Sequence, residues 1–440
     1  MLKQYLKQAW QLMKQNRFYT AVYIIGTGLA IAMVMVMAIV YHIRTANIAP
    51  EVNRDRMLIV SRATASKKGT EYNSNWGLSY ETLKACYYTL ETPEMIAAAV
   101  DGDNLIFGVG DFYTCLPGGK DLYKSFIQCT DANFWKIFRY DFIQGKPYTE
   151  EDFQSGMRQA VLSESLARRL FHSSEAVGRS FMLNDVEYRV SGVVKDVSPV
   201  MPHSYAELWV PFTSISSVAD YAGEENIVGM FTAYLLYNKP EDIPLIEREI
   251  EQKRIAYNLG KKEWEYRTEW KYKTDKYSTI LTYKRWVFRQ LDFNTDFHRL
   301  IIRYGLIAFM FLLIPGVNLS GLTSSRMQEQ IGELGIRKAF GATRSTLMGQ
   351  VLTENFLLTF FGGIAGLLFS YLIVWRVKDT LLSRPYSVID SGMDVSGGML
   401  LNLPVFFYAL GFCFVLNFIS SYIPVRHAAS RPIVDSIHDK

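Results

Sequence analysis

The stretch FYTAVYIIGTGLAIAMVMVMAIVY, residues 18–41, contains no Asp, Glu, Lys or Arg. Residues 304–325, 355–375 and 395–425 form three further uncharged stretches in the last third of the chain. A bilayer core about 30 Å thick is crossed by roughly 20 apolar residues in a helix, because lipid cannot hydrogen-bond the backbone. All four stretches are long enough, so the sequence predicts an α-helical membrane protein with four transmembrane helices.

The basic residues predict the orientation of these helices. Lys3, Lys7, Lys14 and Arg17 precede the first stretch without any acidic residue, which favours a cytoplasmic N-terminus. Four crossings return the C-terminus to the cytoplasm and leave the long segment after the first helix outside it. The first apolar stretch exceeds the core of a cleaved signal (about 7–15 residues), and no small-residue cleavage pattern follows, so we expect a retained anchor.

These patterns divide the chain into segments. Apolar residues of the first 13 positions repeat at helical spacing, typical of a helix in the membrane interface, although a simple extension of the first membrane helix is the alternative. The expected segments are an amphipathic interfacial helix (1–17), transmembrane helix 1 (18–43), an extracytoplasmic domain (44–298), transmembrane helix 2 (299–325), a cytoplasmic coupling segment (326–349), transmembrane helix 3 (350–375), a short extracytoplasmic loop (376–400), transmembrane helix 4 (401–424) and a cytoplasmic tail (425–440).

The residues between helices 1 and 2 predict an α+β fold. A strand over 159–162 precedes a helix that Ser163 caps and that runs to Phe171. Residues 181–183 and 186–194 resemble a hairpin around Asn184 and Asp185, because apolar and polar residues alternate in the second run. Residues 208–212 and 231–237 are further strand candidates, and 240–258 a helix candidate. The Trp-, Tyr- and Lys-rich segment 261–297 has no clear pattern, and we interpret it as a stalk returning to the membrane.

No catalytic, nucleotide-binding or metal-binding motif is present in the sequence. It contains no G-x-x-x-x-G-K-[ST] loop, no H-E-x-x-H and no C-x-x-C. His203 and Glu207 could share a helix face, and Asp101 with Asp103 resembles a turn; we expect neither pair to bind metal or catalyse a reaction. The net charge of +4 does not suggest a nucleic-acid partner.

Cysteines and intramembrane charges are both scarce. Cys86, Cys115 and Cys129 of the outer segment could form at most one disulfide, and their spacing selects no pair. The four predicted spans contain almost no charged residue: Arg303 lies at the outer edge of the second, where it can snorkel, and Glu354 at the inner end of the third. This pattern does not suggest a proton relay or an ion channel.

Small residues mark two of the predicted membrane helices. Gly26 and Gly28 each begin a small-x-x-x-small step on the first helix, and Gly362 and Gly366 form a G-x-x-x-G step on the third. Such steps let helix backbones approach closely. The sequence does not say whether they pack helices within one chain or between two.

The predicted cytoplasmic segment carries the densest local pattern, QEQIGELGIRKAFGATR over residues 328–344. Ile336, Ala339 and Phe340 form an apolar stripe, Arg337 and Lys338 suit the end of a helix, and Gly341 can terminate it. Thr343 or Ser345 can cap the next helix. A membrane-surface hairpin and a lever that docks on a cytoplasmic partner explain this pattern equally well.

These residues resemble the MacB/FtsX-like family of ABC transporter permeases. The match consists of ELGIRKAFGATR at 333–344, QVLTE at 350–354, and the ending PVRHAASRPIVDSI at 424–437. AVLSESLARRLF at 160–171 and VSGVVKD at 190–196 resemble the periplasmic core domain of the same family.

The resemblance implies a non-catalytic permease subunit of an ABC complex in the bacterial inner membrane, with a periplasmic outer domain. It implies that a separate ATPase chain, which holds ATP and Mg, docks on the coupling segment, and that a second copy or a paralogue completes the dimer. The coupling residues implied are Glu333, Leu334, Gly335, Ile336, Arg337, Lys338, Ala339, Phe340, Gly341 and Ala342.

Three functions remain open at this point. The first is export of a periplasmic substrate, driven by transmitting ATPase motion to the outer domain, with a periplasmic adaptor as a further partner. The second is an FtsX-type signal transducer that regulates a cell-wall enzyme. The third is a membrane-anchored binding or sensor protein outside the ABC class, which the coupling motif disfavours. No cofactor is expected on this chain itself, and membrane lipid is its immediate environment.

Overall fold

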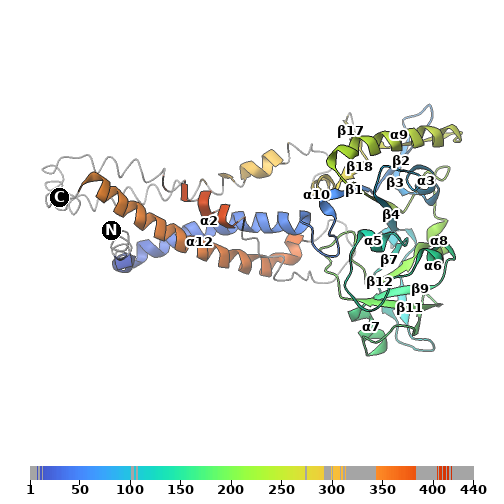
Figure 1. Ribbon diagram of the computed structural model, residues 1–440, viewed down its shortest axis with the longest axis horizontal. Coiled ribbons are helices and arrows are strands. Elements are labelled where there is room, and N and C mark those ends of the chain that lie inside the picture. Colours follow the sequence, from blue (N-terminus) through green and yellow to red (C-terminus); the bar gives the residue numbers. More distant parts are fainter. Residues whose placement is uncertain are drawn as a thin grey trace. The chain divides into compact units, whose positions relative to one another are not determined.

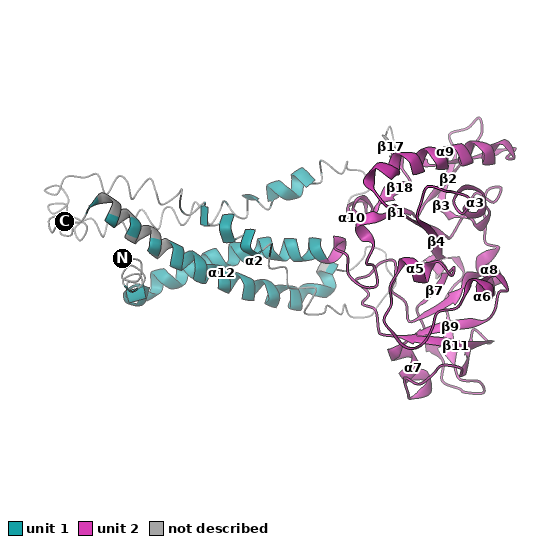
Figure 2. Cartoon of the chain, viewed as in Figure 1, with its two compact units in different colours: residues 1–42, 298–382, 396–440 teal, residues 43–297, 383–395 magenta. Residues whose placement is uncertain are grey.

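The computed structural model describes residues 7, 10–11, 13–100, 104–105, 108–272, 275–291, 299, 301–307, 309–310, 313 and 343–382, together with 404, 406–408, 410–412, 414–415 and 418. Two compact units divide the chain, as Figure 2 shows in two colours. One, here called the membrane unit, comprises residues 1–42, 298–382 and 396–440. The other, here called the outer domain, comprises residues 43–297 and 383–395.

Two long helices, α2 (Arg17–Thr45) and α12 (Arg344–Leu382), make up most of the described part of the membrane unit. Among the described residues, α2 and the segment Phe356–Thr380 of α12 are long and apolar enough to cross a membrane. Described residues of the other two predicted spans, among them 301–307 and 406–408, are also helical. The backbone at 13–15 is helical and turns at Asn16 before α2 begins.

The outer domain is an α+β fold built on one large mixed sheet (Figure 1). Its strand order is β18-β1-β14-β4-β7-β12-β9-β11-β10-β5-β6, with β8 paired to β11. These strands are β1 (Met57–Val60), β4 (Met95–Val100), β5 (Tyr113–Cys115), β6 (Tyr123–Lys124), β7 (Ile127–Thr130), β8 (Phe142–Gly145), β9 (Gln159–Ser163), β10 (Ser180–Leu183), β11 (Val186–Val194), β12 (Leu208–Pro211), β14 (Thr232–Leu236) and β18 (Ile280–Thr282).

A smaller four-stranded sheet and a hairpin complete the β structure. The smaller sheet has the order β13-β3-β2-β15, and β16 pairs with β17. The strands are β2 (Ala63–Lys67), β3 (Asn73–Leu78), β13 (Val228–Gly229), β15 (Trp264–Arg267), β16 (Glu269–Tyr272) and β17 (Asp275–Ser278). The helices are η1 (Arg54–Arg56), α3 (Tyr80–Cys86), α5 (Phe134–Ile137), α6 (Glu150–Gln154), α7 (Glu164–Phe171), η2 (Phe212–Ser214), α8 (Ser216–Ala219), η3 (Pro240–Asp242), α9 (Ile243–Leu259) and α10 (Tyr283–Leu291).

The central strands of the large sheet are buried on both faces. In β4, Ile96, Ala98 and Val100 belong to one apolar cluster, while Ala97 and Ala99 belong to another. Successive side chains of a strand point to opposite faces, so each cluster covers one side of the sheet. The sheet therefore forms the middle layer of the outer domain.

Several local predictions are confirmed. Ser163 caps α7 by accepting a hydrogen bond from the backbone N–H of Leu166. Strands β10 and β11 form the expected hairpin, and both turn residues, Asn184 and Asp185, have positive φ. Two such residues are what a type I′ turn requires. The candidates at 208–212, 231–237 and 240–258 correspond to β12, β14 and η3 with α9.

The stalk predicted for 261–297 is wrong for its described part. Strand β15 pairs with β2, and β18 pairs with β1, so this segment completes both sheets of the outer domain. Its partners lie about two hundred residues earlier in the chain, and no local pattern reports such a pairing.

The helix face proposed for His203 and Glu207 is also wrong. Residues 202–204 form a turn, none of residues 201–207 is helical, and His203 is buried. Its backbone N–H donates to Glu51, and its ring Nδ1 lies 3.1 Å from the Tyr234 hydroxyl. Asp101 and Asp103 lie outside the described residues. Cys86, Cys115 and Cys129 are buried free thiols.

Candidate functional site

The predicted coupling segment, residues 333–342, lies outside the described residues. The helix that follows it begins at Arg344, and the Thr343 hydroxyl accepts a hydrogen bond of 3.3 Å from the Thr346 backbone N–H. Of the two predicted caps, Thr343 is therefore the one observed, while Ser345 lies inside the helix. Helix α12 then continues to Leu382, so one long helix follows the predicted coupling segment.

Close approach of α2 and α12 brings three of the four predicted packing glycines together. A Cβ added to Gly366 would lie 2.8 Å from the Gly28 carbonyl oxygen and 2.8 Å from the Ile31 Cβ. A Cβ on Gly362 would lie 2.8 Å from the Thr27 Cβ. Both distances are too short for any side chain, so this crossing requires glycine. Gly26, in contrast, has nothing within 4 Å of an added Cβ.

A buried ion pair lies where α2 ends and the outer domain begins. Glu51 and Arg54 have fully buried side chains, and Arg54 Nε donates to Glu51 Oε2 over 2.8 Å. Tyr283 donates its hydroxyl to the same oxygen over 2.7 Å. The other carboxylate oxygen, Oε1, accepts from the His203 backbone N–H at 2.9 Å and from Ser204 Oγ at 3.0 Å. Four donors therefore surround one carboxylate.

A second nitrogen of Arg54 holds the end of α2, while the third, Nη2, donates to the Met201 sulfur at 2.9 Å. Arg54 Nη1 donates to the carbonyl oxygens of Ile43 at 2.8 Å and Ala46 at 2.9 Å. The last carbonyls of a helix have no partner within the helix and carry a partial negative charge, so a guanidinium satisfies both needs. The guanidinium also lies 4.9 Å from the centre of the Tyr283 ring. We call Glu51, Arg54, His203, Ser204 and Tyr283 the helix-end clamp.

The electrostatics of the helix-end clamp favour its charged form. Burial alone would raise the pKa of Glu51, but the charges of Arg54 and His203 and the donated hydrogen bonds outweigh it and lower the pKa to about 2. Burial raises the pKa of Tyr283 well above its usual value, and the neighbouring carboxylate adds to this effect. Tyr283 therefore stays a neutral donor and Glu51 a charged acceptor at any physiological pH.

Sequence reasoning missed the helix-end clamp, although one signal was present. Glu51 and Arg54 stand three residues apart directly after the first apolar stretch. The other three members come from positions 203, 204 and 283, and only the fold brings them there.

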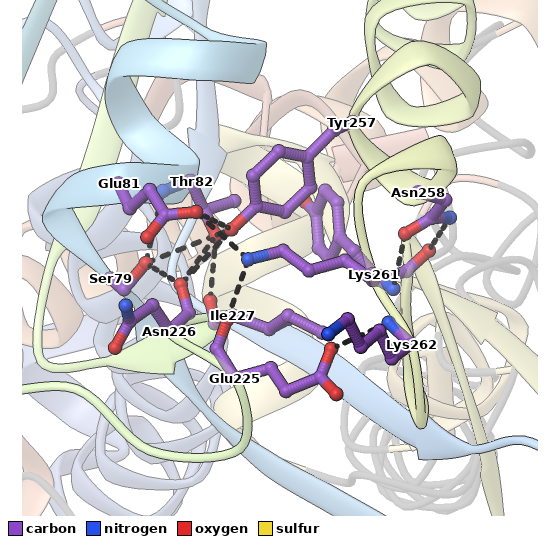
Figure 3. Close-up of polar contacts among 11 residues, drawn as sticks. Ser79, Glu81, Thr82, Glu225, Asn226, Ile227, Tyr257, Asn258, Lys261 and Lys262 are labelled. Carbon is purple, nitrogen blue, oxygen red and sulfur yellow. Dashed lines mark hydrogen bonds and ion pairs between the residues drawn. The ribbon is translucent and has the colours of Figure 1, made fainter.

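A second polar cluster joins α3, the loop before β13 and the end of α9 (Figure 3). Lys261 Nζ donates to Glu81 Oε1 at 2.8 Å and to the Glu225 carbonyl at 2.6 Å. Tyr257 donates to Glu81 and to the Asn226 carbonyl, at 3.1 Å each. Partial burial acts to raise the pKa of Glu81, but the hydrogen bond from Lys261 has the larger effect in combination with the other donors, and the pKa is lowered.

The loop that this cluster holds has an unusual backbone. Glu224, Glu225 and Asn226 have φ of 34°, 52° and 62°. Left-handed backbone costs about 1–2 kcal/mol for each non-glycine residue, so neighbouring contacts must fix it. The Glu225 carboxylate does so by accepting from the backbone N–H groups of Lys262 and Glu263. The cluster is thus a structural tie between two loops. No group of three or more His, Cys, Asp or Glu among the described residues is placed to hold a metal ion.

The geometry described so far combines close-packed apolar helices with an α+β domain. Residues 20–253 match the MacB-like periplasmic core domain, and residues 305–433 match the FtsX-like permease C-terminal domain. The chain belongs to the ABC transporter permeases of the MacB/FtsX type and is a membrane protein with an extracytoplasmic core domain.

Individual relatives are distant in sequence. The pyoverdine export ATP-binding/permease protein PvdT of Pseudomonas fluorescens is 24% identical over 96% of this chain and 57% of its own length. The macrolide export ATP-binding/permease protein MacB of Wolinella succinogenes is 22% identical over 96% of this chain and 59% of its own. The uncharacterized ABC transporter permease YknZ of Bacillus subtilis is 27% identical over 52% of this chain and 51% of its own. The chain thus spans about half the length of the curated relatives it matches.

Proposed function

We propose that this chain is the membrane subunit of an ABC exporter and transmits the motion of a separate ATPase to its outer domain. The observation that carries the proposal is the helix-end clamp. Helix α2 is continuous from Arg17 to Thr45, and Arg54 bonds its final carbonyls within the outer domain. A displacement of α2 along its axis therefore acts on the clamp rather than on a flexible linker.

The strength of the clamp suits this role. Removing one partner of a buried ion pair typically costs about 3–5 kcal/mol, because the other charge is left uncompensated. The clamp also ties Glu51 to Tyr283, the first residue of α10, and α10 follows β18, which pairs with β1. Force that enters at Arg54 reaches the large sheet through these two strands.

The proposed energy source is a separate ATPase dimer on the cytoplasmic side. Residues 333–342 would contact it, with Arg337 and Lys338 as its cationic docking residues, while ATP and Mg would be bound by the ATPase itself. Two permease subunits, either two copies or a copy and a paralogue, would match the two halves of that dimer. The fused ATP-binding and permease names of PvdT and MacB support the pairing of these two activities.

The proposed cargo is a substrate taken from the periplasm by a complex in the bacterial inner membrane. The names of the PvdT and MacB relatives refer to export of pyoverdine and macrolides, which favours export over regulation of a cell-wall enzyme. A periplasmic adaptor would then receive the cargo.

The double variant Arg337→Glu, Gly341→Pro tests the docking assignment. We expect it to insert normally but to lose copurification of the ATPase and the stimulation of ATP turnover, because the charge is reversed and the helix end is altered. Arg384→Glu, in the predicted loop on the other side, serves as the control and should retain both. Unchanged copurification and turnover in the double variant would contradict the assignment.

A further inference from the structure

The two ends of the outer domain meet at one place on its surface. The domain begins at the last turn of α2, which Arg54 bonds, and α10, the last described helix before residue 297, bonds Glu51 through Tyr283. Ile43 is the last residue of predicted transmembrane helix 1, and predicted transmembrane helix 2 begins at about residue 299. Helix α2 and α10 are thus the described elements of the outer domain nearest in sequence to the first two predicted spans, and both meet at the helix-end clamp.

Exposed cations surround this place. Lys284 and Arg285 follow Tyr283 directly on α10, and both side chains are exposed. Arg139 is exposed as well, and its backbone N–H donates to the carbonyl of Pro50, the neighbour of Glu51. Lys136 is exposed one turn earlier, on α5. We call Lys136, Arg139, Lys284 and Arg285 the basic collar.

Acidic residues do not neutralise the basic collar within the described part of the chain. None of its four members takes part in an ion pair among the described residues. Of the acids nearby in sequence, Glu51 and Asp131 are buried, Asp141 is paired with Lys195, and Asp55 is exposed. Four cations against one free carboxylate leave a net positive surface.

We infer that the basic collar binds the headgroups of anionic phospholipids in the leaflet that α2 enters. Each Lys or Arg close to an anionic membrane surface raises the affinity for that surface about fivefold. Salt weakens this attraction, which falls off with distance over one Debye length. The stems of Lys and Arg can also lie along the apolar boundary while the charges remain at the phosphate level. Lipid composition would therefore set how firmly the outer domain rests on the bilayer.

Acetylation of lysines by acetic anhydride, a neutral reagent, measures the contact on the full-length protein in nanodiscs. Lys284 should react several-fold more slowly in nanodiscs containing about one third phosphatidylglycerol than in pure phosphatidylcholine, and roughly 0.5 M NaCl should abolish the difference. Lys262, an exposed lysine beyond the end of α9, is the internal control and should react equally in both. Soluble glycerophosphoglycerol added to phosphatidylcholine nanodiscs should not protect Lys284.

Two variants complete the test. Arg139→Gln with Arg285→Gln should reduce the protection of Lys284 about fivefold or more, because two neighbouring phosphate ligands are lost. Arg158→Gln with Arg248→Gln removes the same charge from exposed positions elsewhere and should leave the protection unchanged. Equal reactivity of Lys284 in the two lipids, protection by the soluble headgroup alone, or undiminished protection in the first variant would each overturn the inference.

Discussion

Glu51→Gln should reduce the loss of outer-domain stability between pH 6 and pH 3 by about 2 kcal/mol. The pKa of Glu51 is about 2 in the folded protein against 4.5 in the unfolded chain. A depressed pKa stabilises the fold above pH 4.5, and this stabilisation is lost as the pH falls toward 2. The shift corresponds to about 3 kcal/mol in total, of which about 2 kcal/mol is lost between pH 6 and pH 3.

The assay is urea unfolding of the full-length protein in detergent, read by pulse proteolysis of the outer domain at pH 6 and pH 3. From pH 6 to pH 3 the free energy of unfolding should fall by about 2 kcal/mol more in the wild type than in Glu51→Gln. At pH 6 the variant itself should be about 3–5 kcal/mol less stable, because Arg54 keeps its charge without a carboxylate.

Glu94→Gln is the matched control, because Glu94 pairs with Arg56 at a partly exposed site. Exposed ion pairs contribute only about 0–1 kcal/mol, so this variant should follow the wild type. Equal acid dependence in the wild type and Glu51→Gln, or equal neutral-pH losses in the two Gln variants, would refute the role assigned to the clamp.

Three further predictions concern other parts of the chain. Gly366→Leu should lower the thermal stability of the membrane unit by several degrees, since an added side chain meets α2 at 2.8 Å, whereas Gly26→Leu, with nothing within 4 Å, should not; equal melting temperatures would contradict the packing. Lys261→Met should weaken the left-handed loop by about 1–3 kcal/mol, seen as faster hydrogen exchange at 223–228, and unchanged exchange would show that Lys261 does not hold it. Leu259→Cys, at a side chain that is 85% exposed, should react with an impermeant maleimide from the periplasmic side, and labelling only in broken cells would invert the orientation.

Local sequence patterns predicted those elements whose stabilising contacts lie within a few residues. Ser163 caps a helix that starts at the next residue, and Asn184 with Asp185 turns a hairpin whose strands are adjacent. The lengths of the uncharged stretches were sufficient to predict α2 and α12, because whether a stretch can cross the bilayer depends on that stretch alone.

Elements whose stabilising contacts come from distant parts of the chain could not be predicted from local patterns. The segment after residue 261 seemed irregular because β15 and β18 find their partners in β2 and β1. The spacing of His203 and Glu207 suggested a shared helix face, yet His203 lies in the core beside Glu51, 152 positions away. The helix-end clamp shows the same limit, since three of its five members lie 152, 153 and 232 positions after Glu51.

The central claim is that ATP hydrolysis by a companion protein moves the outer domain through α2. The most direct measurement places a fluorophore on Cys-substituted Leu259 and an acceptor lipid in proteoliposomes that contain the permease and its ATPase. We predict an ATP-dependent change in energy transfer that Glu51→Gln greatly reduces while ATP turnover persists. An unchanged signal during turnover, or full transport activity without any ATPase, would contradict the account.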